Sequence, residues 1–339
     1  MLFELPRFEY VEPRTVGEAL SILAEYGTRA KILGGGTDLL GLMKDRISGP
    51  KMPIPEVLVD VKRISEIRAI EHLQDRSVVG SGVTLTEISS NGELASRFPS
   101  FVQAAGSVAT KQIRNMGTLG GNLCQRPWCW YFRHPAFECF KKGGRQCYAI
   151  TGDNSTYFSV YNIGTCVMSH PSDTAPALIS LGASVRIASA KNGVREVPLV
   201  DFFLGPKSVQ ENILQPEELL LHASIPLDRG GRGRARSVYL KERIRENWDF
   251  ALASVAASGS LDSDGRIDSV RVVLGGVAPL PFPLDLSGVL LGRKLDGSTR
   301  AAVSSHLSAK AKPLKMNRYK VRIIRALVQR ALEAIFTPV

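Results

Sequence analysis

The sequence predicts an α+β protein of more than one domain, and three observations support this. At 339 residues the chain is long enough for two or three domains. Short apolar segments alternate with amphipathic ones in its N-terminal part, and its C-terminal part contains three strand-like segments followed by two helical ones. Hydrophobic residues make up 44% and charged residues 22%, the usual balance of a globular protein.

The N-terminal elements follow from capping residues and apolar spacing. Thr15 and Glu18 fit a capping box at the start of a helix that Gly27 ends. The apolar stripe of this helix is Val16, Ala19, Leu20 and Leu23. The other segments expected before the cysteines are strands at 31–33, 57–61 and 77–83 and helices at 38–44 and 100–110. After the cysteines we expect strands at 165–169, 183–189 and 218–225 and a helix at 173–181.

The C-terminal part predicts a three-stranded sheet covered by helices. Strands are expected at 237–244, 251–261 and 269–277, and helices at 298–309 and 317–336. An arginine- and glycine-rich stretch from Arg229 to Arg236 marks the expected domain boundary and contributes to the net charge of +11. Such a stretch can bind single-stranded nucleic acid, but this one is short and has no interleaved aromatic residue. We therefore favour a linker loop and expect no nucleic-acid partner.

Two glycine-rich segments are candidates for binding a diphosphate. Gly34, Gly35 and Gly36 lie between a strand and a helix, and residues 117–122 read Gly-Thr-Leu-Gly-Gly-Asn. Glycine lets backbone amides approach a phosphate, because it has no Cβ and adopts positive φ readily, and a helix N-terminus adds positive potential. Thr37 offers a hydroxyl donor, whereas Asp38 would repel a phosphate and is expected to cap the helix or point away. Neither segment matches G-x-G-x-x-G or a P-loop. Each alone is better explained as a tight turn, but two in one domain favour a phosphate site.

All five cysteines lie in one stretch of the chain, at positions 124, 129, 139, 147 and 166. A disulfide scaffold would spread them through a small secreted fold, so the clustering indicates a local metal site. The absence of a C-x-x-C pair argues against a zinc finger and against the ferredoxin pattern, and buried free thiols are the alternative. Neighbouring aromatic residues would exclude water, while Lys141, Lys142 and Arg145 would offset the charge of thiolate ligands.

Motifs along almost the whole chain match a single family pattern. They are Phe8-x-Tyr10-x-x-Pro13, Thr37-Asp38-Leu39-Leu40, Ile113-Arg114-Asn115-x-Gly117-Thr118-x-Gly120-Gly121-Asn122, Pro171-Ser172-Asp173, Ile225-Pro226, Lys241-x-x-x-Arg245, Leu274-Gly275-Gly276-Val277-Ala278-Pro279 and Asn317-x-Tyr319-Lys320-Val321. In these motifs the chain resembles the FAD-binding subunit of the molybdenum hydroxylases, the xanthine dehydrogenase and carbon monoxide dehydrogenase group.

The resemblance implies an FAD-binding domain of the vanillyl-alcohol-oxidase (PCMH) type at residues 1–228, in two lobes of about 1–60 and 61–228. A C-terminal domain of the carbon monoxide dehydrogenase flavoprotein type, with a three-stranded antiparallel sheet and helices, would occupy residues 229–339. In relatives the two glycine segments hold the diphosphate, the residue matching Asp173 bonds the ribityl-isoalloxazine region, and the lysine matching Lys241 lies by the pyrimidine edge. A cation there would stabilise the anionic reduced flavin. The residues expected at FAD are Leu33, Gly34, Gly35, Gly36, Thr37, Asp38, Leu39, Arg114, Asn115, Gly117, Thr118, Gly120, Gly121, Asn122, Asp173, Ile225 and Lys241.

Thr37 stands near the position at which some members of the wider fold attach FAD through a histidine, so we expect non-covalent FAD. The cysteine region, about residues 124–166, is similar to an insert in the β subunit of 4-hydroxybenzoyl-CoA reductase. It is closer in spacing to the insert of periplasmic-type aldehyde oxidoreductases. In those relatives the insert binds a [4Fe-4S] cluster. The resemblance therefore implies Cys129, Cys139, Cys147 and Cys166 as ligands and leaves Cys124 as the spare cysteine.

The function implied is an electron relay with no catalytic residue of its own. Electrons would pass between FAD, the [4Fe-4S] cluster and the [2Fe-2S] clusters of a small partner, with a large molybdopterin subunit as the other partner and a ferredoxin or similar protein as a possible external carrier. A standalone FAD-dependent oxidase of the same fold and a zinc-stabilised nucleic-acid-binding protein are the alternatives. No apolar run of about 18 residues and no signal peptide is evident, so we expect no membrane span and a cytoplasmic location, or a periplasmic one if a partner directs export.

Overall fold

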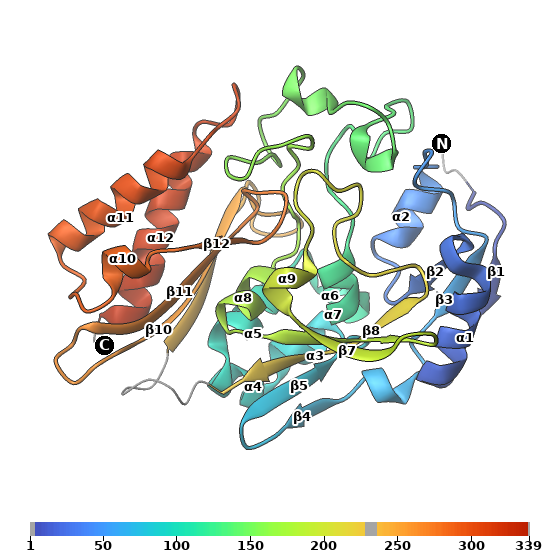
Figure 1. Cartoon of the computed structure of the whole chain (residues 1–339), viewed down its shortest axis with the longest axis horizontal. Coiled ribbons are helices and arrows are strands. Elements are labelled where there is room, and N and C mark those ends of the chain that lie inside the picture. The colour runs from blue at the N-terminus through green and yellow to red at the C-terminus, as the bar shows by residue number, and fades with distance from the viewer. Residues whose placement is uncertain (1–3, 228–235, 338–339) are drawn as a thin grey trace.

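The computed structural model describes residues 4–227 and 236–337, which form three sheets with helices packed against them (Figure 1). The arginine- and glycine-rich stretch from Arg229 to Arg236 carries the predicted domain boundary. All of it except Arg236 lies outside the described part of the chain. None of the described helices has the length and apolar composition of a membrane span.

The first sheet is parallel, in the order β1-β3-β2. Its strands are β1 (Glu9–Val11), β2 (Ala30–Leu33) and β3 (Val57–Asp60), and its helices are α1 (Val16–Tyr26) and α2 (Leu39–Lys44). As predicted, the Thr15 hydroxyl accepts from the Glu18 amide at 3.1 Å, but the Glu18 carboxylate accepts from the Arg14 amide instead of closing a capping box. Gly27 ends α1 at φ 52°. The predicted start and end of the first helix are therefore confirmed.

The second sheet is antiparallel, in the order β4-β5-β8-β6-β7. Its strands are β4 (Ile70–His72), β5 (Arg76–Gly80), β6 (Ser184–Ser189), β7 (Gly193–Pro198) and β8 (Glu218–Pro226). Its helices are α3 (Leu85–Ser90), α4 (Gly92–Arg97), α5 (Pro99–Gly106), α6 (Lys111–Met116), α7 (Leu119–Cys124), α8 (Thr174–Ser180) and α9 (Leu199–Phe202). The helix predicted at 100–110 ends at Gly106, because the chain turns there with Ala109 at φ 39° and Thr110 caps the next helix.

The third sheet, in the order β12-β11-β10-β9, is antiparallel. It contains β9 (Arg236–Glu242), β10 (Ala253–Leu261), β11 (Ile267–Gly275) and β12 (Phe282–Leu284), followed by α10 (Ser287–Leu290), α11 (Gly297–Lys310) and α12 (Lys320–Phe336). The three predicted strands are present, and β12 adds a fourth that was not predicted, because it has three residues with a proline at its centre. Helix α5 contacts β9 and β10, and α8 contacts β10 and β11, so both parts of the chain meet at this sheet, on which α12 also packs.

The segment between α7 and α8 contains only short turns and isolated bridges, and Figure 1 draws it in green at the top of the view. The strand predicted at 165–169 is wrong, since Met168 forms only an isolated bridge with Phe158. The Cys166 amide donates instead to Pro206 O at 3.1 Å and the Ser169 amide to Tyr157 O. The buried Lys320 ammonium fastens this segment to the C-terminal part, donating to Thr156 O, Phe158 O and Gly276 O at 2.8–3.0 Å.

Candidate functional site

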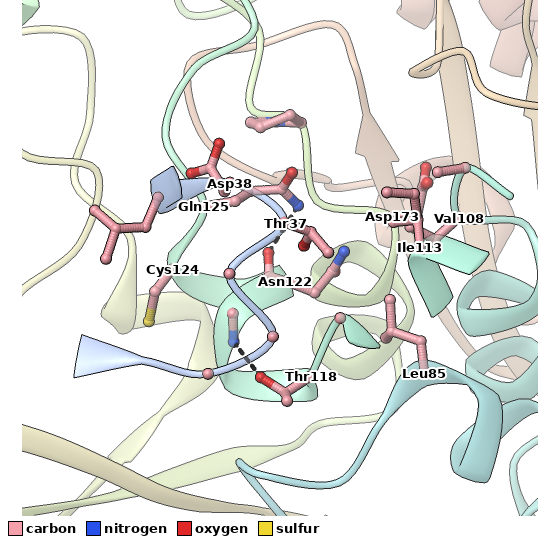
Figure 2. Close-up of a pocket in the computed structure, with 18 of the residues that line it drawn as sticks. Thr37, Asp38, Leu85, Val108, Ile113, Thr118, Asn122, Cys124, Gln125 and Asp173 are labelled. Atoms are coloured by element: carbon pink, nitrogen blue, oxygen red, sulfur yellow. Dashed lines mark hydrogen bonds between the residues drawn. The ribbon is translucent and has the colours of Figure 1, made fainter. Parts of the chain in front are cut away.

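A cavity of about 290 Å³ is lined by the end of β2, by residues of α3, α6 and α7 and by β9, and both glycine segments belong to its wall (Figure 2). Thirteen of the seventeen residues predicted at FAD line this cavity. The lining set from the prediction is Leu33, Gly34, Gly35, Gly36, Thr37, Asp38, Leu39, Gly117, Thr118, Gly121, Asn122, Asp173 and Lys241. The wall also contains residues that the prediction missed: Ile32, Leu85, Val108, Ala109, Ile113, Cys124, Gln125, Trp128, Pro171, Trp248, Asp249 and Phe250.

The first glycine segment leaves its backbone amides available to a ligand. Among the described residues, the amides of Gly34, Gly35, Gly36 and Thr37 donate to no protein acceptor. Gly36 has φ 72°, which glycine adopts without strain. A Cβ on Gly35 would lie 1.8 Å from the Met116 carbonyl oxygen, so only glycine allows this loop to touch the end of α6.

The second glycine segment differs from the predicted loop, because residues 119–124 form helix α7. Thr118 caps this helix by accepting from the Gly121 amide at 3.1 Å. The amides of Leu119 and Gly120 donate to Val83 O and Ser81 O, and the Asn122 amide donates to Thr118 O. Most amides of this segment therefore have protein partners. The second glycine segment therefore contributes closely packed backbone to the cavity wall. The amides without a protein acceptor lie in the first glycine segment.

Four of the residues predicted at FAD lie outside the cavity wall. The Arg114 guanidinium donates to Val108 O at 2.7 Å and so holds the turn before α6, and Asn115 accepts from the Thr86 hydroxyl at 2.7 Å. Gly120 packs against Ser81, and Ile225 is fully buried in β8 within the core of the second sheet. These residues shape the surrounding structure and do not face the cavity.

The Asp38 side chain points away from the first glycine segment. This is the second of the two orientations that we predicted for it. It stands at the N-cap of α2 but makes no capping hydrogen bond with its side chain. One carboxylate oxygen accepts from the Arg126 amide at 2.8 Å, and the other forms an ion pair with Arg133. The glycine segment is therefore tied to the beginning of the cysteine region.

A buried ion pair lies at the side of the cavity formed by β9 and α8. Lys241 Nζ is 2.6 Å from one oxygen of Asp173, and the Tyr239 hydroxyl donates to the other at 2.6 Å. Lys241 also donates to Ser107 O at 3.3 Å. Burial, and next the Asp173 charge, raise the pKa of Tyr239, so this residue stays a neutral donor.

Four cysteines line a second, smaller cavity together with aromatic residues and Lys141. They are Cys129, Cys139, Cys147 and Cys166. Backbone amides bond each sulfur: those of 131 and 132 bond Cys129, those of 141 and 142 bond Cys139, those of 149, 150 and 167 bond Cys147, and that of 168 bonds Cys166. The Cys166 thiol also bonds the Cys147 sulfur, which with these amides lowers the pKa of Cys147 to about 6.

Cys124 stands apart from these four. It lines the larger cavity, on the opposite side from Asp173 in the view of Figure 2. Burial alone raises its pKa to about 12, with no amide bonded to its sulfur. Within residues 4–227 and 236–337, no three histidine, cysteine or acidic side chains are grouped closely enough to hold one metal ion.

Comparison with known proteins identifies the chain. Residues 6–228 match the model of the FAD binding domain in molybdopterin dehydrogenase, and residues 238–335 match the carbon monoxide dehydrogenase flavoprotein C-terminal domain. The chain belongs to the FAD-binding subunits of the molybdopterin dehydrogenases. The resemblance drawn from the motifs, the mixed helix-and-sheet fold and the enzyme class are thereby confirmed.

Several relatives match over nearly their full length. The chain is 31% identical over 322 residues to the FAD-binding subunit PaoB of an aldehyde oxidoreductase from Escherichia coli (strain K12), covering 94% of this chain and 95% of that protein. It is 28% identical over 334 residues to the carbon monoxide dehydrogenase medium chain of Hydrogenophaga pseudoflava, covering 97% of each. The solved carbon monoxide dehydrogenase of that organism superposes with a TM-score of 0.76 at 26% identity, over 98% of each chain.

Proposed function

We propose that this chain carries FAD in the larger cavity and a [4Fe-4S] cluster on Cys129, Cys139, Cys147 and Cys166, and that it relays electrons between them. When bound, FAD exchanges electrons in pairs or singly and the cluster exchanges them one at a time. The observation that carries the proposal is that these four sulfurs line one cavity, each bonded by backbone amides, and that residues 127–129 connect its wall to that of the larger cavity.

The residues of the larger cavity suit a dinucleotide. The free amides of the first glycine segment, followed by α2, offer donors for the diphosphate. The apolar wall and the buried Lys241 suit an isoalloxazine ring, because a cation at its pyrimidine edge favours negative charge on the reduced ring. Position 37 is a threonine and not a histidine, so it provides no side chain for a covalent link to FAD.

The donor set of the smaller cavity suits a polynuclear cluster better than a single ion. In a four-iron cluster each thiolate binds a different iron, so the sulfurs must stand around a cavity. A single zinc ion would need them to converge on one point, and no such grouping occurs among the described residues. Amide bonds to the sulfurs are one of the means by which a protein adjusts the potential of a cluster.

Buried cations next to the cysteines support a negatively charged occupant. Lys141 and Lys142 are 2% and 0% exposed. Lys141 pairs with the buried Glu211 at 3.1 Å, while Lys142 donates to the His134 carbonyl at 2.8 Å. Burial lowers the pKa of Lys142, whereas the charges of Cys139 and Cys129 raise it, so thiolate ligands favour the ammonium form that offsets their charge. The same rationale explains why two lysines lie beside an otherwise apolar cavity.

The assembly of this chain is proposed from its relatives. The relative from Hydrogenophaga is called a medium chain, which implies a smaller and a larger partner. We propose that this chain likewise joins a small [2Fe-2S] subunit and a large molybdopterin subunit. The cluster would connect FAD to an external carrier such as a ferredoxin, in either direction of electron flow. We also propose the division at residues 1–228 and 229–339.

Analysis of the anaerobically purified chain tests the proposal. We expect one FAD and four irons with matching acid-labile sulfide per chain. Cys139→Ala should lose the iron, because its sulfur lines the smaller cavity, whereas the matched control Cys124→Ala should keep all four. Iron that survives Cys139→Ala but disappears with Cys124→Ala would contradict the ligand assignment, and a chain free of iron and sulfide would contradict the cluster.

A further inference from the structure

Trp128 lies at the boundary between the two cavities. The residue lines the larger cavity, while its neighbours in sequence, Pro127 and Cys129, line the smaller one. Because Cys129 is a proposed cluster ligand, an aromatic side chain at the FAD site and a ligand sulfur at the cluster site belong to consecutive residues. One peptide unit joins them.

The Trp128 ring is held from two sides although the residue is 38% exposed. The Phe250 ring packs against it at 5.2 Å between centroids, and the Arg133 guanidinium lies 4.7 Å from its centroid as a cation–π contact. Arg133 also donates to Pro127 O at 2.9 Å and pairs with Asp38 at the first glycine segment. A single arginine thus fixes the ring relative to both the cysteine region and the FAD cavity.

We propose that Trp128 is a positioning residue for electron transfer, with its ring in contact with the isoalloxazine and its backbone leading to the cluster ligand. This inference rests on the proposed function. One electron leaves the reduced FAD and enters the oxidised cluster, or moves in reverse, and the flavin proton is exchanged with solvent at the cavity mouth. Trp128 is neither oxidised nor reduced, and no bond to it forms or breaks. Its ring fills the space between the isoalloxazine and the ligand cysteine, which the electron would otherwise have to cross without intervening atoms.

Trp130 provides a matched control. It flanks Cys129 on the other side, has the same size and is 41% exposed. Its ring contacts Tyr157 at 5.5 Å and is not part of the wall of the larger cavity. Substitution of either tryptophan by leucine removes an aromatic ring next to the same ligand, but only Trp128 has its ring at the FAD site.

The test is an anaerobic flash reduction of FAD in the full chain, in which reoxidation of the flavin and bleaching of the cluster are followed by visible absorbance. We expect both Trp128→Leu and Trp130→Leu to retain FAD and four irons. Transfer should be severalfold slower in Trp128→Leu, unchanged in Trp130→Leu, and largely restored in Trp128→Phe. Equal rates in the two leucine variants would overturn the inference while leaving the proposed function intact. A wild-type chain without iron and sulfide would overturn both.

A second measurement does not depend on iron. In the iron-free chain, a tryptophan in contact with bound FAD quenches flavin emission, so the emission should rise in Trp128→Leu and stay at the wild-type level in Trp130→Leu. This comparison decides the placement of the ring even if Trp128→Leu fails to assemble the cluster. Emission that is the same in both variants would overturn the proposed contact.

Discussion

Lys241 Nζ lies 2.6 Å from Asp173 Oδ2, and their side chains are 3% and 4% exposed. Lys241 belongs to β9 of the third sheet, and Asp173 directly precedes α8. The C-terminal and N-terminal parts of the chain therefore contribute one charge each. The Tyr239 hydroxyl donates a hydrogen bond to the other oxygen of the Asp173 carboxylate. The wall of the larger cavity is therefore complete only when the C-terminal sheet packs on α5 and α8.

Lys241→Met should destabilise the chain strongly. The substitution leaves the Asp173 carboxylate buried with one partner removed, and breaking a buried pair in this way costs about 3–5 kcal/mol. Urea denaturation of the FAD-free chain measures the loss. In the double variant with Asp173→Asn the loss should be smaller than the sum of the single losses, because the uncompensated charge is gone. Strict additivity would contradict a coupled pair.

Gly35→Ala should abolish FAD binding. Its Cβ would lie 1.8 Å from the Met116 carbonyl oxygen, so the first glycine segment would have to move away from the end of α6. Gly41→Ala is the control, since nothing lies within 4 Å of a Cβ there and alanine favours the helix. FAD content after purification and FAD titration provide the measurement. Wild-type FAD content in Gly35→Ala would show that the close approach is not required.

Asp38→Ala should loosen the cysteine region from the larger cavity. It removes the acceptor of the Arg126 amide and the partner of Arg133. Both contacts are partly buried, so we expect a loss of about 1 kcal/mol, the low end of the cost of leaving a buried donor unsatisfied. We expect a lower free energy of unfolding and faster proteolysis within residues 125–170. Asp45→Ala, at the exposed end of the same helix, should change neither. Identical proteolysis of the two variants would refute this role for Asp38.

His170 should make the chain less stable in acid. Burial lowers the pKa of this imidazole from 6.5 to about 3. Between these values the unfolded chain binds a proton that the folded chain does not, so the His170 contribution falls as pH drops from 6.5 toward 3, by up to about 1.4 kcal/mol per pH unit. His170→Asn can still accept from the Ser172 amide but does not titrate. Its unfolding free energy should depend less steeply on pH in this window, and equal slopes would contradict the burial argument.

Local signals predicted much of the fold and part of the site. Thr15 and Gly27 mark the first helix because capping depends on residues adjacent in sequence. The same kind of signal was available at Thr84 and Glu87, which close a complete capping box at the start of α3, a helix that the prediction missed. Helix α7 was predicted as a loop because Gly120 and Gly121 lie in one turn, and two glycines in a turn disfavour a helix. The Thr118 cap was the signal that indicated a helix.

The sequence alone determined which groups are available: glycines that can bring amides close to a phosphate, five cysteines in one stretch, and a basic and aromatic surround. Only the tertiary structure decided how they are used. Folding pairs most amides of the second glycine segment with Ser81, Val83 and Thr118 and leaves those of the first without protein acceptors. It also brings four cysteines to one cavity and Cys124 to another. The physical reason is that hydrogen-bond partners and cavity walls come from residues far apart in the chain, which no local pattern records.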